Sequence, residues 1–118
     1  MPMKVVHPGP AAPAREQLLE RARVLVPVLR ERAQRCEELR RIPDETLRAL
    51  HDARLFRMLQ PQRVGGAELD YPILVDACAE ISRGCGSTGW VLGNLAAHHW
   101  MLAMWPCWRG TRACVRCC

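Results

Sequence analysis

The sequence predicts an all-α domain, and three observations lead to this prediction. Leu, Ala, Arg and Glu abound while β-branched residues are sparse, a composition that favours helices. Apolar residues recur at steps of three and four along much of the chain. A turn with three glycines precedes a segment, residues 90–105, that is apolar almost all the way round. With 118 residues, the chain is long enough for one small domain.

The first helix is predicted over residues 15 to about 41. It follows a Pro-, Ala- and Gly-rich stretch, residues 1–14, that we expect to be a disordered tail. Pro27 should kink this helix, because proline lacks a backbone donor and clashes with the preceding turn. The apolar stripe that should face the core comprises Leu18, Ala22, Leu25, Leu29, Ala33 and Cys36.

Two more helices are predicted in the middle of the chain. One begins at residues 42–45, where a proline and two acids suit a first turn, and ends near Arg54. Residues 56–61 should be extended, and residues 61–70 should form a loop around a Gly-Gly pair. The next helix is expected over residues 72 to about 83. The predicted buried residues of both helices are Leu47, Leu50, Leu55, Leu74, Ala77, Cys78 and Ile81.

The fourth helix should begin at Ser87, a good N-cap residue, and run to about Trp105. A helix that is apolar on every face must be covered on all sides, and the rest of the chain offers little with which to cover it. We therefore expect other chains, or domains beyond this sequence, to pack against this helix. Without them, its uncovered side predicts poor solubility.

Composition and patterning exclude several classes of protein. The net charge of +5 forms no basic stripe interleaved with aromatic residues, so no nucleic-acid partner is expected. The apolar run at residues 90–105 is too short, and too interrupted by polar residues, for a membrane span. Gly84, Gly86 and Gly89 fit the spacing of a dinucleotide fingerprint but follow a helix rather than a strand, which rejects a Rossmann site. No secretory signal is visible, which favours a cytoplasmic protein.

Four stretches of the chain point to one known family: residues 25–33, residues 42–45 with Leu55 and Phe56, residues 61–68, and residues 80–90 with His98 and Trp100. Together they resemble the N-terminal helical domain of the acyl-CoA dehydrogenase-like flavoenzymes. The turn at residues 83–90 followed by His98 is most similar to the oxygenase component of the two-component flavin-dependent aromatic monooxygenases. Arg54 departs from the family's usual glycine, and Val64 departs from a usual aromatic residue.

The resemblance implies a complete enzyme of three parts, of which a central β-barrel and a C-terminal four-helix bundle are absent from this chain. It implies that a separate flavin reductase supplies reduced FMN or FAD, which with O2 hydroxylates an aromatic, phenol-type small molecule. It also implies a homo-oligomer of the tetramer type. The chain alone, lacking most of the site, is expected to be inactive and to bind no flavin tightly.

The resemblance also assigns two site residues. Trp90 would form an apolar wall of the flavin pocket, and His98 would be the catalytic residue beside the phenol oxygen. Their separation places both side chains within about 80° on a helix, at the ~100° step per residue. An imidazole can accept or donate a proton near neutral pH, which suits the stabilisation of a phenolate. His99 is expected to face solvent or an oligomer partner.

Two other interpretations remain open. The first is a fragment of an acyl-CoA dehydrogenase, against which the pairing of Trp90 with His98 argues. The second is a non-catalytic helical interaction module, or an inactive remnant, that binds a partner through the uncovered helix. A single stoichiometry in size-exclusion measurements would favour a module, whereas aggregation or mixed oligomers would favour a remnant.

The last segment, residues 106–118, is unlike the rest of the chain. It contains no acidic residue and holds four of the seven cysteines, Cys107, Cys114, Cys117 and Cys118. Four-thiolate zinc sites usually present two separated pairs, a spacing that these cysteines lack, so no metal site is expected. We interpret the segment as an off-pattern tail after a domain at residues 15–105, and the chain as truncated or frameshifted. Resequencing the locus tests that interpretation.

Overall fold

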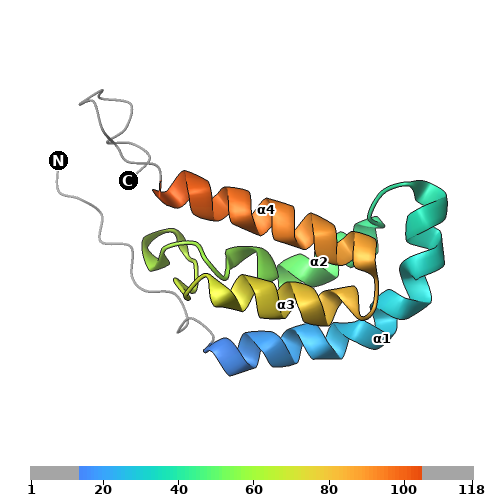
Figure 1. The fold of residues 1–118 in the computed structure, drawn as a ribbon, viewed down its shortest axis with the longest axis horizontal. Coiled ribbons are helices and arrows are strands. Elements are labelled where there is room, and N and C mark those ends of the chain that lie inside the picture. The colour runs from blue at the N-terminus through green and yellow to red at the C-terminus, as the bar shows by residue number, and fades with distance from the viewer. Residues whose placement is uncertain (1–13, 105–118) are drawn as a thin grey trace.

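The computed structural model describes residues 14–104, which form four α-helices and two short 3₁₀ helices (Figure 1). In chain order the elements are α1 (Arg15–Leu39), α2 (Asp44–Asp52), η1 (Leu55–Arg57), η2 (Gln62–Val64), α3 (Pro72–Ser82) and α4 (Gly86–Met104). No strand occurs within residues 14–104, which confirms the all-α prediction. Residues 1–13 of the tail predicted over residues 1–14, the segment 106–118 and the helix end predicted at Trp105 lie outside the described residues.

Helix α3 lies between α1 and α4, and its contacts with these two helices build most of the core (Figure 1). The short helix η1 contacts both α2 and α4 and so links them. The four helices share one core, because every one of them contributes to its fully buried apolar side chains. These are Leu18, Leu29, Leu50, Leu55, Met58, Ile73, Ile81 and Leu92.

Helix α1 forms as predicted, but it buries a broader stripe than the sequence suggested. Leu25 and Ala33 are only partly buried, whereas Leu19 and Val26 are buried. Pro27 lies inside the helix and is exposed. Figure 1 shows the C-terminal turns of α1 bent toward the start of α2. Pro27 therefore lies on the solvent side of α1. Because proline has no backbone N–H, the carbonyl group one turn earlier lacks its helical partner, and water can bind to it there.

The segment between α2 and α3 differs from the prediction that residues 56–61 are extended. Instead, η1 and the bends that follow it fold the chain back on itself. The Ala67 N–H donates to the Arg57 oxygen at 2.9 Å, and the Leu69 N–H donates to the Met58 oxygen at 3.0 Å. The prediction was wrong because these partners lie in the following loop, which a local apolar pattern does not reveal.

Three residues between α2 and α3 have left-handed backbone conformations, and the last of them is Glu68, with a φ of 51°. Arg54 has a φ of 61° and Gly65 has a φ of 85°. The Arg54 guanidinium donates to the Gly65 backbone oxygen at 2.6 Å and so joins these two positions. A Cβ atom at Gly66 would lie 1.9 Å from the Gln60 backbone oxygen. The loop predicted around the glycine pair therefore requires glycine at position 66 for space, and favours it at position 65 for conformation.

The start of α4 also corrects a prediction. The helix begins at Gly86 rather than after an N-cap at Ser87. The Ser87 hydroxyl donates instead to the Glu37 carboxylate at 2.8 Å. Because that acceptor belongs to α1, the hydroxyl joins two helices rather than capping one.

Candidate functional site

Helix α4 is covered on one side only. Thr88, Leu92 and Ala96 face the core and are at most 1% exposed. As expected, the described part of the chain leaves much of the remaining apolar surface of α4 open. The exposed large side chains are Trp90 (74% exposed), Leu95 (42%), Met101 (49%) and Leu102 (69%). An apolar surface of this kind marks an interaction or ligand site.

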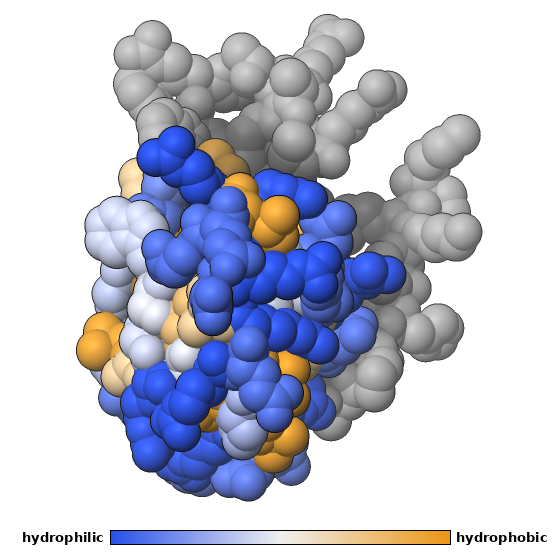
Figure 2. Space-filling view, turned by 90° about the vertical axis from the view of Figure 1, so that its right-hand side faces the viewer, coloured by the Kyte–Doolittle hydropathy of each residue, from blue (hydrophilic) through white to orange (hydrophobic). Residues whose placement is uncertain are grey.

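The end of the molecule where α1 meets α2 has a different character. Figure 2 shows mainly hydrophilic side chains on that face, with apolar ones in separate patches. The Arg41 guanidinium donates to Asp44 at 2.8 Å, and this hydrogen bond lowers the pKa of the Asp44 carboxyl. Exposed ion pairs such as this one contribute little to stability, and this end is mainly a solvated surface.

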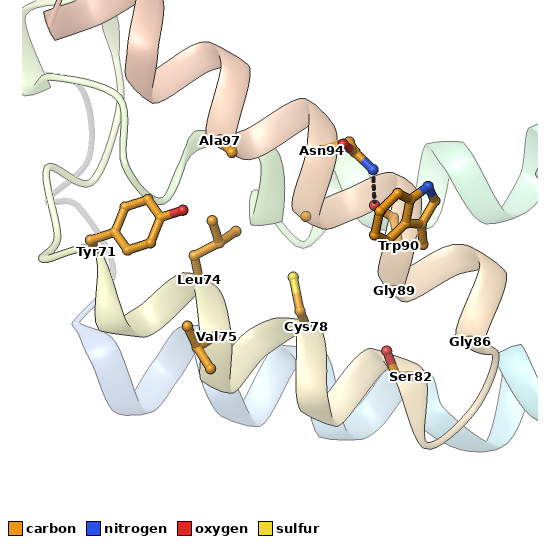
Figure 3. Close-up of a pocket in the computed structure, with 11 residues that line it drawn as sticks. Tyr71, Leu74, Val75, Cys78, Ser82, Gly86, Gly89, Trp90, Asn94 and Ala97 are labelled. Carbon is orange, nitrogen blue, oxygen red and sulfur yellow. Dashed lines mark hydrogen bonds between the residues drawn. The ribbon is translucent and has the colours of Figure 1, made fainter.

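An uncharged groove runs between α3 and α4 (Figure 3). Its volume is about 490 Å³. In Figure 3, Tyr71 and Trp90 stand at its two ends, with Leu74 and Cys78 between them. Among the described residues, none that lines the groove carries a charge. A groove with aromatic ends and an apolar floor suits a flat ring better than a charged group.

Glycines allow α4 to approach α3 closely along this groove. A Cβ atom at Gly89 would lie 1.9 Å from the Ser82 hydroxyl oxygen, and one at Gly93 would lie 3.3 Å from the Cys78 sulfur. Burial raises the pKa of the Cys78 thiol, so this side chain stays protonated at neutral pH and acts as apolar surface. Helix backbone and small side chains thus form the groove's floor.

Trp90, Asn94 and His98 form a row along α4, each one turn after the last. The Asn94 side chain donates to the Trp90 backbone oxygen at 3.1 Å (Figure 3). His98 Nδ1 lies 2.5 Å from the Asn94 backbone oxygen. The structure therefore places both predicted site residues on one edge of α4, and both are exposed. Trp90 lines the groove, whereas His98 does not.

The structure corrects the prediction that His99 faces solvent or a partner. His99 is half-buried, and its Nδ1 lies 3.3 Å from the Phe56 backbone oxygen. Its ring also meets the Phe56 ring edge-on, with centroids 6.5 Å apart. The error follows from the missed helix η1, since that turn carries Phe56 against α4.

Sequence reasoning missed two residues of this region. Asn94 could have been found, because it lies one turn after Trp90 and one turn before His98. Tyr71 carries no local signal, since its edge-on contact with Trp100, at 5.1 Å between ring centroids, joins distant parts of the chain. The tertiary fold alone places this tyrosine at the end of the groove.

The part of the chain that the structure describes contains neither a cluster of metal-binding side chains nor a helix that could cross a membrane. Over residues 14–104, no three His, Cys, Asp or Glu side chains gather in a way that could hold a metal ion. The four cysteines of residues 106–118 lie outside this range. None of the described helices combines the length and the apolar character that crossing a membrane requires.

The structure defines the class of this protein as an all-helical domain in which one helix is left open on its apolar side. This chain belongs to the acyl-CoA dehydrogenase N-terminal domain family, whose model matches residues 13–112. The family resemblance inferred from the sequence is therefore confirmed.

Individual relatives show which members of the family this chain is similar to. The oxygenase subunit HsaA of a flavin-dependent monooxygenase from Rhodococcus jostii (strain RHA1) is 45% identical over 86 residues, covering 73% of this chain and 22% of that protein. The oxygenase component of an FADH(2)-dependent resorcinol hydroxylase from Rhizobium sp. (strain MTP-10005) is 39% identical over 90 residues, covering 76% and 22%. The crystal structure of the HsaA monooxygenase from M. tuberculosis matches with a TM-score of 0.74 at 41% identity, covering 76% of this chain and 25% of that chain. The chain thus spans a quarter or less of the length of these relatives.

Proposed function

We propose that this chain is the N-terminal helical part of the oxygenase component of a two-component flavin-dependent aromatic hydroxylase. The observation that carries the proposal is the row of Trp90, Asn94 and His98 on the open side of α4. This row sets an exposed indole and an exposed imidazole along one helix edge. The relatives of this chain are oxygenase components of flavin-dependent enzymes.

The described residues fit the ring system of a flavin, either FMN or FAD. The groove beside Trp90 is uncharged, has aromatic side chains at both ends and offers helix backbone at its floor. No cation lines it among the described residues, so the flavin phosphate would need partners elsewhere in the complete protein. A bound reduced flavin would supply the electrons for the reaction with O2.

In the proposed enzyme, His98 binds the hydroxyl group of a phenol-type substrate. A backbone oxygen can only accept, so the contact with Asn94 requires the hydrogen on Nδ1 and leaves Nε2 of the neutral ring as an acceptor. A phenol that donates to Nε2 can pass its proton to the imidazole, and the resulting phenolate ring is richer in electrons. Trp90 would form the apolar wall that keeps water away from the reacting rings.

The rest of the proposed enzyme covers the open side of α4. We assign that role to the β-barrel and the C-terminal bundle that the family resemblance implies, in a homo-oligomer of the tetramer type. A separate flavin reductase would deliver the reduced flavin in the cytoplasm. The free thiols of Cys36, Cys78 and Cys85 suit such a reducing compartment.

A chimera tests the proposal. Residues 14–104 replace the matching segment of the Rhodococcus jostii relative, and the purified protein receives reduced flavin, O2 and a phenol-type substrate. We expect hydroxylated product from the chimera, and loss of most of that product when His98 is changed to Ala. A soluble, flavin-binding chimera that forms no product would contradict the proposal. Oxidation of an acyl-CoA by the same chimera would favour the dehydrogenase alternative.

A titration separates the role of the chain alone from that of the complete enzyme. The purified chain is titrated with reduced FMN and with reduced FAD, and quenching of tryptophan fluorescence is followed. We expect no saturable quenching, because the chain supplies one wall of the site only. Saturable quenching that Trp90→Phe removes and Trp100→Phe retains would show that the chain holds more of the flavin site. A single oligomeric stoichiometry, together with an inactive chimera, would favour an interaction module.

A further inference from the structure

Two buried cysteines meet where the end of α1 packs against the turn that leads into α4. Cys36 lies in the last turns of α1 and is 4% exposed, and Cys85 directly precedes α4 and is 6% exposed. The Cys85 thiol lies close enough to the Cys36 thiol to help raise its pKa. The sequence places Cys36 on the apolar stripe of the first helix and Cys85 in the turn at residues 83–90, and neither position requires this pairing.

Neighbouring contacts independently hold the turn before α4 and the start of α4 against α1. The Ser87 hydroxyl donates to Glu37 at 2.8 Å, which ties the residue after Cys36 to the first turn of α4. On the other side, a Cβ atom at Gly84 would lie 2.7 Å from both the Val26 oxygen and the Leu29 Cβ. The turn before Cys85 is therefore packed directly on α1.

One of the two cysteines lines a groove on the surface of the molecule. Cys36 lines a second groove, of about 560 Å³, between the end of α1 and the start of α4. Gly86, Ser87 and Trp90 line the same groove. A molecule the size of hydrogen peroxide can enter this groove and approach Cys36, whereas Cys85 does not line it.

We propose that Cys36 and Cys85 are an oxidation-sensitive pair that peroxide converts to a disulfide, which locks the start of α4 to α1. The Cys36 sulfur attacks one peroxide oxygen, forming a sulfenic acid and releasing one water. The Cys85 thiol then attacks that sulfur, so that the S–S bond forms and a second water leaves. Two thiols are oxidised by two electrons, and one peroxide is reduced to two waters. Trp90, one turn into α4, would be fixed relative to α1.

The raised pKa of the Cys36 thiol limits the rate of this reaction. Burial and the neighbouring Cys85 raise the pKa of the Cys36 thiol, so the reactive thiolate is scarce at neutral pH. We therefore expect slower oxidation than at an exposed thiol, and reversal by dithiothreitol. Cys78 provides a matched control, because it is a partly buried thiol whose groove lies between α3 and α4 instead.

Peptide mapping of the full chain tests the pair. The chain is exposed to hydrogen peroxide, its remaining thiols are blocked with N-ethylmaleimide, and it is digested with trypsin and chymotrypsin. We expect a dithiothreitol-sensitive species in which residues 36–40 are linked to residues 84–90. Cys78→Ser should retain this species and Cys85→Ser should lose it. Separate blocking or oxidation of Cys36 and Cys85, or linkage of Cys36 mainly to another cysteine, would overturn the proposal.

A thermal melt tests the locking. The melting temperature of the peroxide-treated chain should rise above that of the reduced chain, because the disulfide restricts the unfolded state. The Cys36→Ser variant should show no such rise under the same treatment. A linked wild-type chain whose melting temperature is unchanged would show that the bond does not lock α4 to α1.

Discussion

His98 Nδ1 lies 2.5 Å from the backbone oxygen of Asn94, one turn earlier in α4. This contact fixes both the rotation and the tautomer of an otherwise exposed imidazole, because a carbonyl oxygen can only accept a hydrogen bond. The ring nitrogen that remains, Nε2, is left as an acceptor. An exposed side chain held in one orientation in this way suits a binding or proton-transfer role.

Changing His98 to Ala should therefore affect turnover and not stability. In the chimera described above, we expect the turnover number to fall by about 10² to 10⁴, the range for loss of a general base. The free energy of unfolding of the chain should change by less than about 0.5 kcal/mol, since the side chain is exposed. Product analysis and urea unfolding measure the two effects.

His99→Ala is the matched control, and it should behave in the opposite way. Its Nδ1 contacts the Phe56 backbone oxygen, so its removal should cost about 1 kcal/mol of stability. Product formation by the folded chimera should be retained. If His98→Ala turns over as fast as the parent chimera, the proton-accepting role is wrong.

Gly66 and Gly86 should respond oppositely to the same added methyl group. Gly66→Ala would bring a Cβ atom within 1.9 Å of the Gln60 backbone oxygen, and we expect a loss of more than about 2 kcal/mol. Gly86→Ala meets nothing within 4 Å at the start of α4 and should gain about 0.5 kcal/mol. Urea unfolding of both variants checks the prediction, which equal effects would contradict.

Arg54 stores local strain in its left-handed conformation. Arg54→Ala removes the hydrogen bond to the Gly65 oxygen and keeps the strained φ, whereas Arg54→Gly removes both the bond and the strain. The glycine variant should therefore be about 1 kcal/mol more stable than the alanine variant. Thermal melts of the two variants measure this difference, and equal stability would show that the conformation carries no strain.

The fold was largely predictable from the sequence, because apolar spacing marks α1 and α3, and the glycine turn marks the start of α4. The helix η1 was not, since the backbone oxygens of Arg57 and Met58 find their partners in a later loop. The orientation of His99 was mispredicted for the same reason, because its partner Phe56 lies in η1. The role of Ser87 was missed for a similar reason, because its partner Glu37 lies 50 residues away.

The candidate site was predictable in part. Helical geometry alone places Trp90 and His98 on one edge, and the structure agrees. The link through Asn94 requires knowledge of side-chain rotamers, and the groove requires the packing of α3 against two glycines of α4. These features are tertiary, so spacing along the chain could not supply them.

Alkaline pH should destabilise the chain through its buried thiols. Burial raises the pKa of Cys36 in the folded state above the unfolded value of about 8.5, so the folded chain holds the proton more tightly. The associated stability is present below that pH and is lost as the pH rises through the folded pKa. Urea midpoints measured in a reducing buffer should therefore fall with rising pH above about 9. Cys36→Ala should show a smaller fall, and an identical slope would contradict this prediction.

The open side of α4 should control self-association. Trp90 and Leu102 are 74% and 69% exposed, and their apolar surface favours contact between copies of the isolated chain. Changing both to Gln should lower light scattering and shift the size-exclusion profile toward monomer. The free energy of unfolding should change by less than about 0.5 kcal/mol, because neither side chain is in the core. Val24→Gln is the control, since Val24 is 65% exposed on α1, away from this surface. If Val24→Gln reduces association as much as the double change, general surface hydrophobicity is responsible rather than the face of α4.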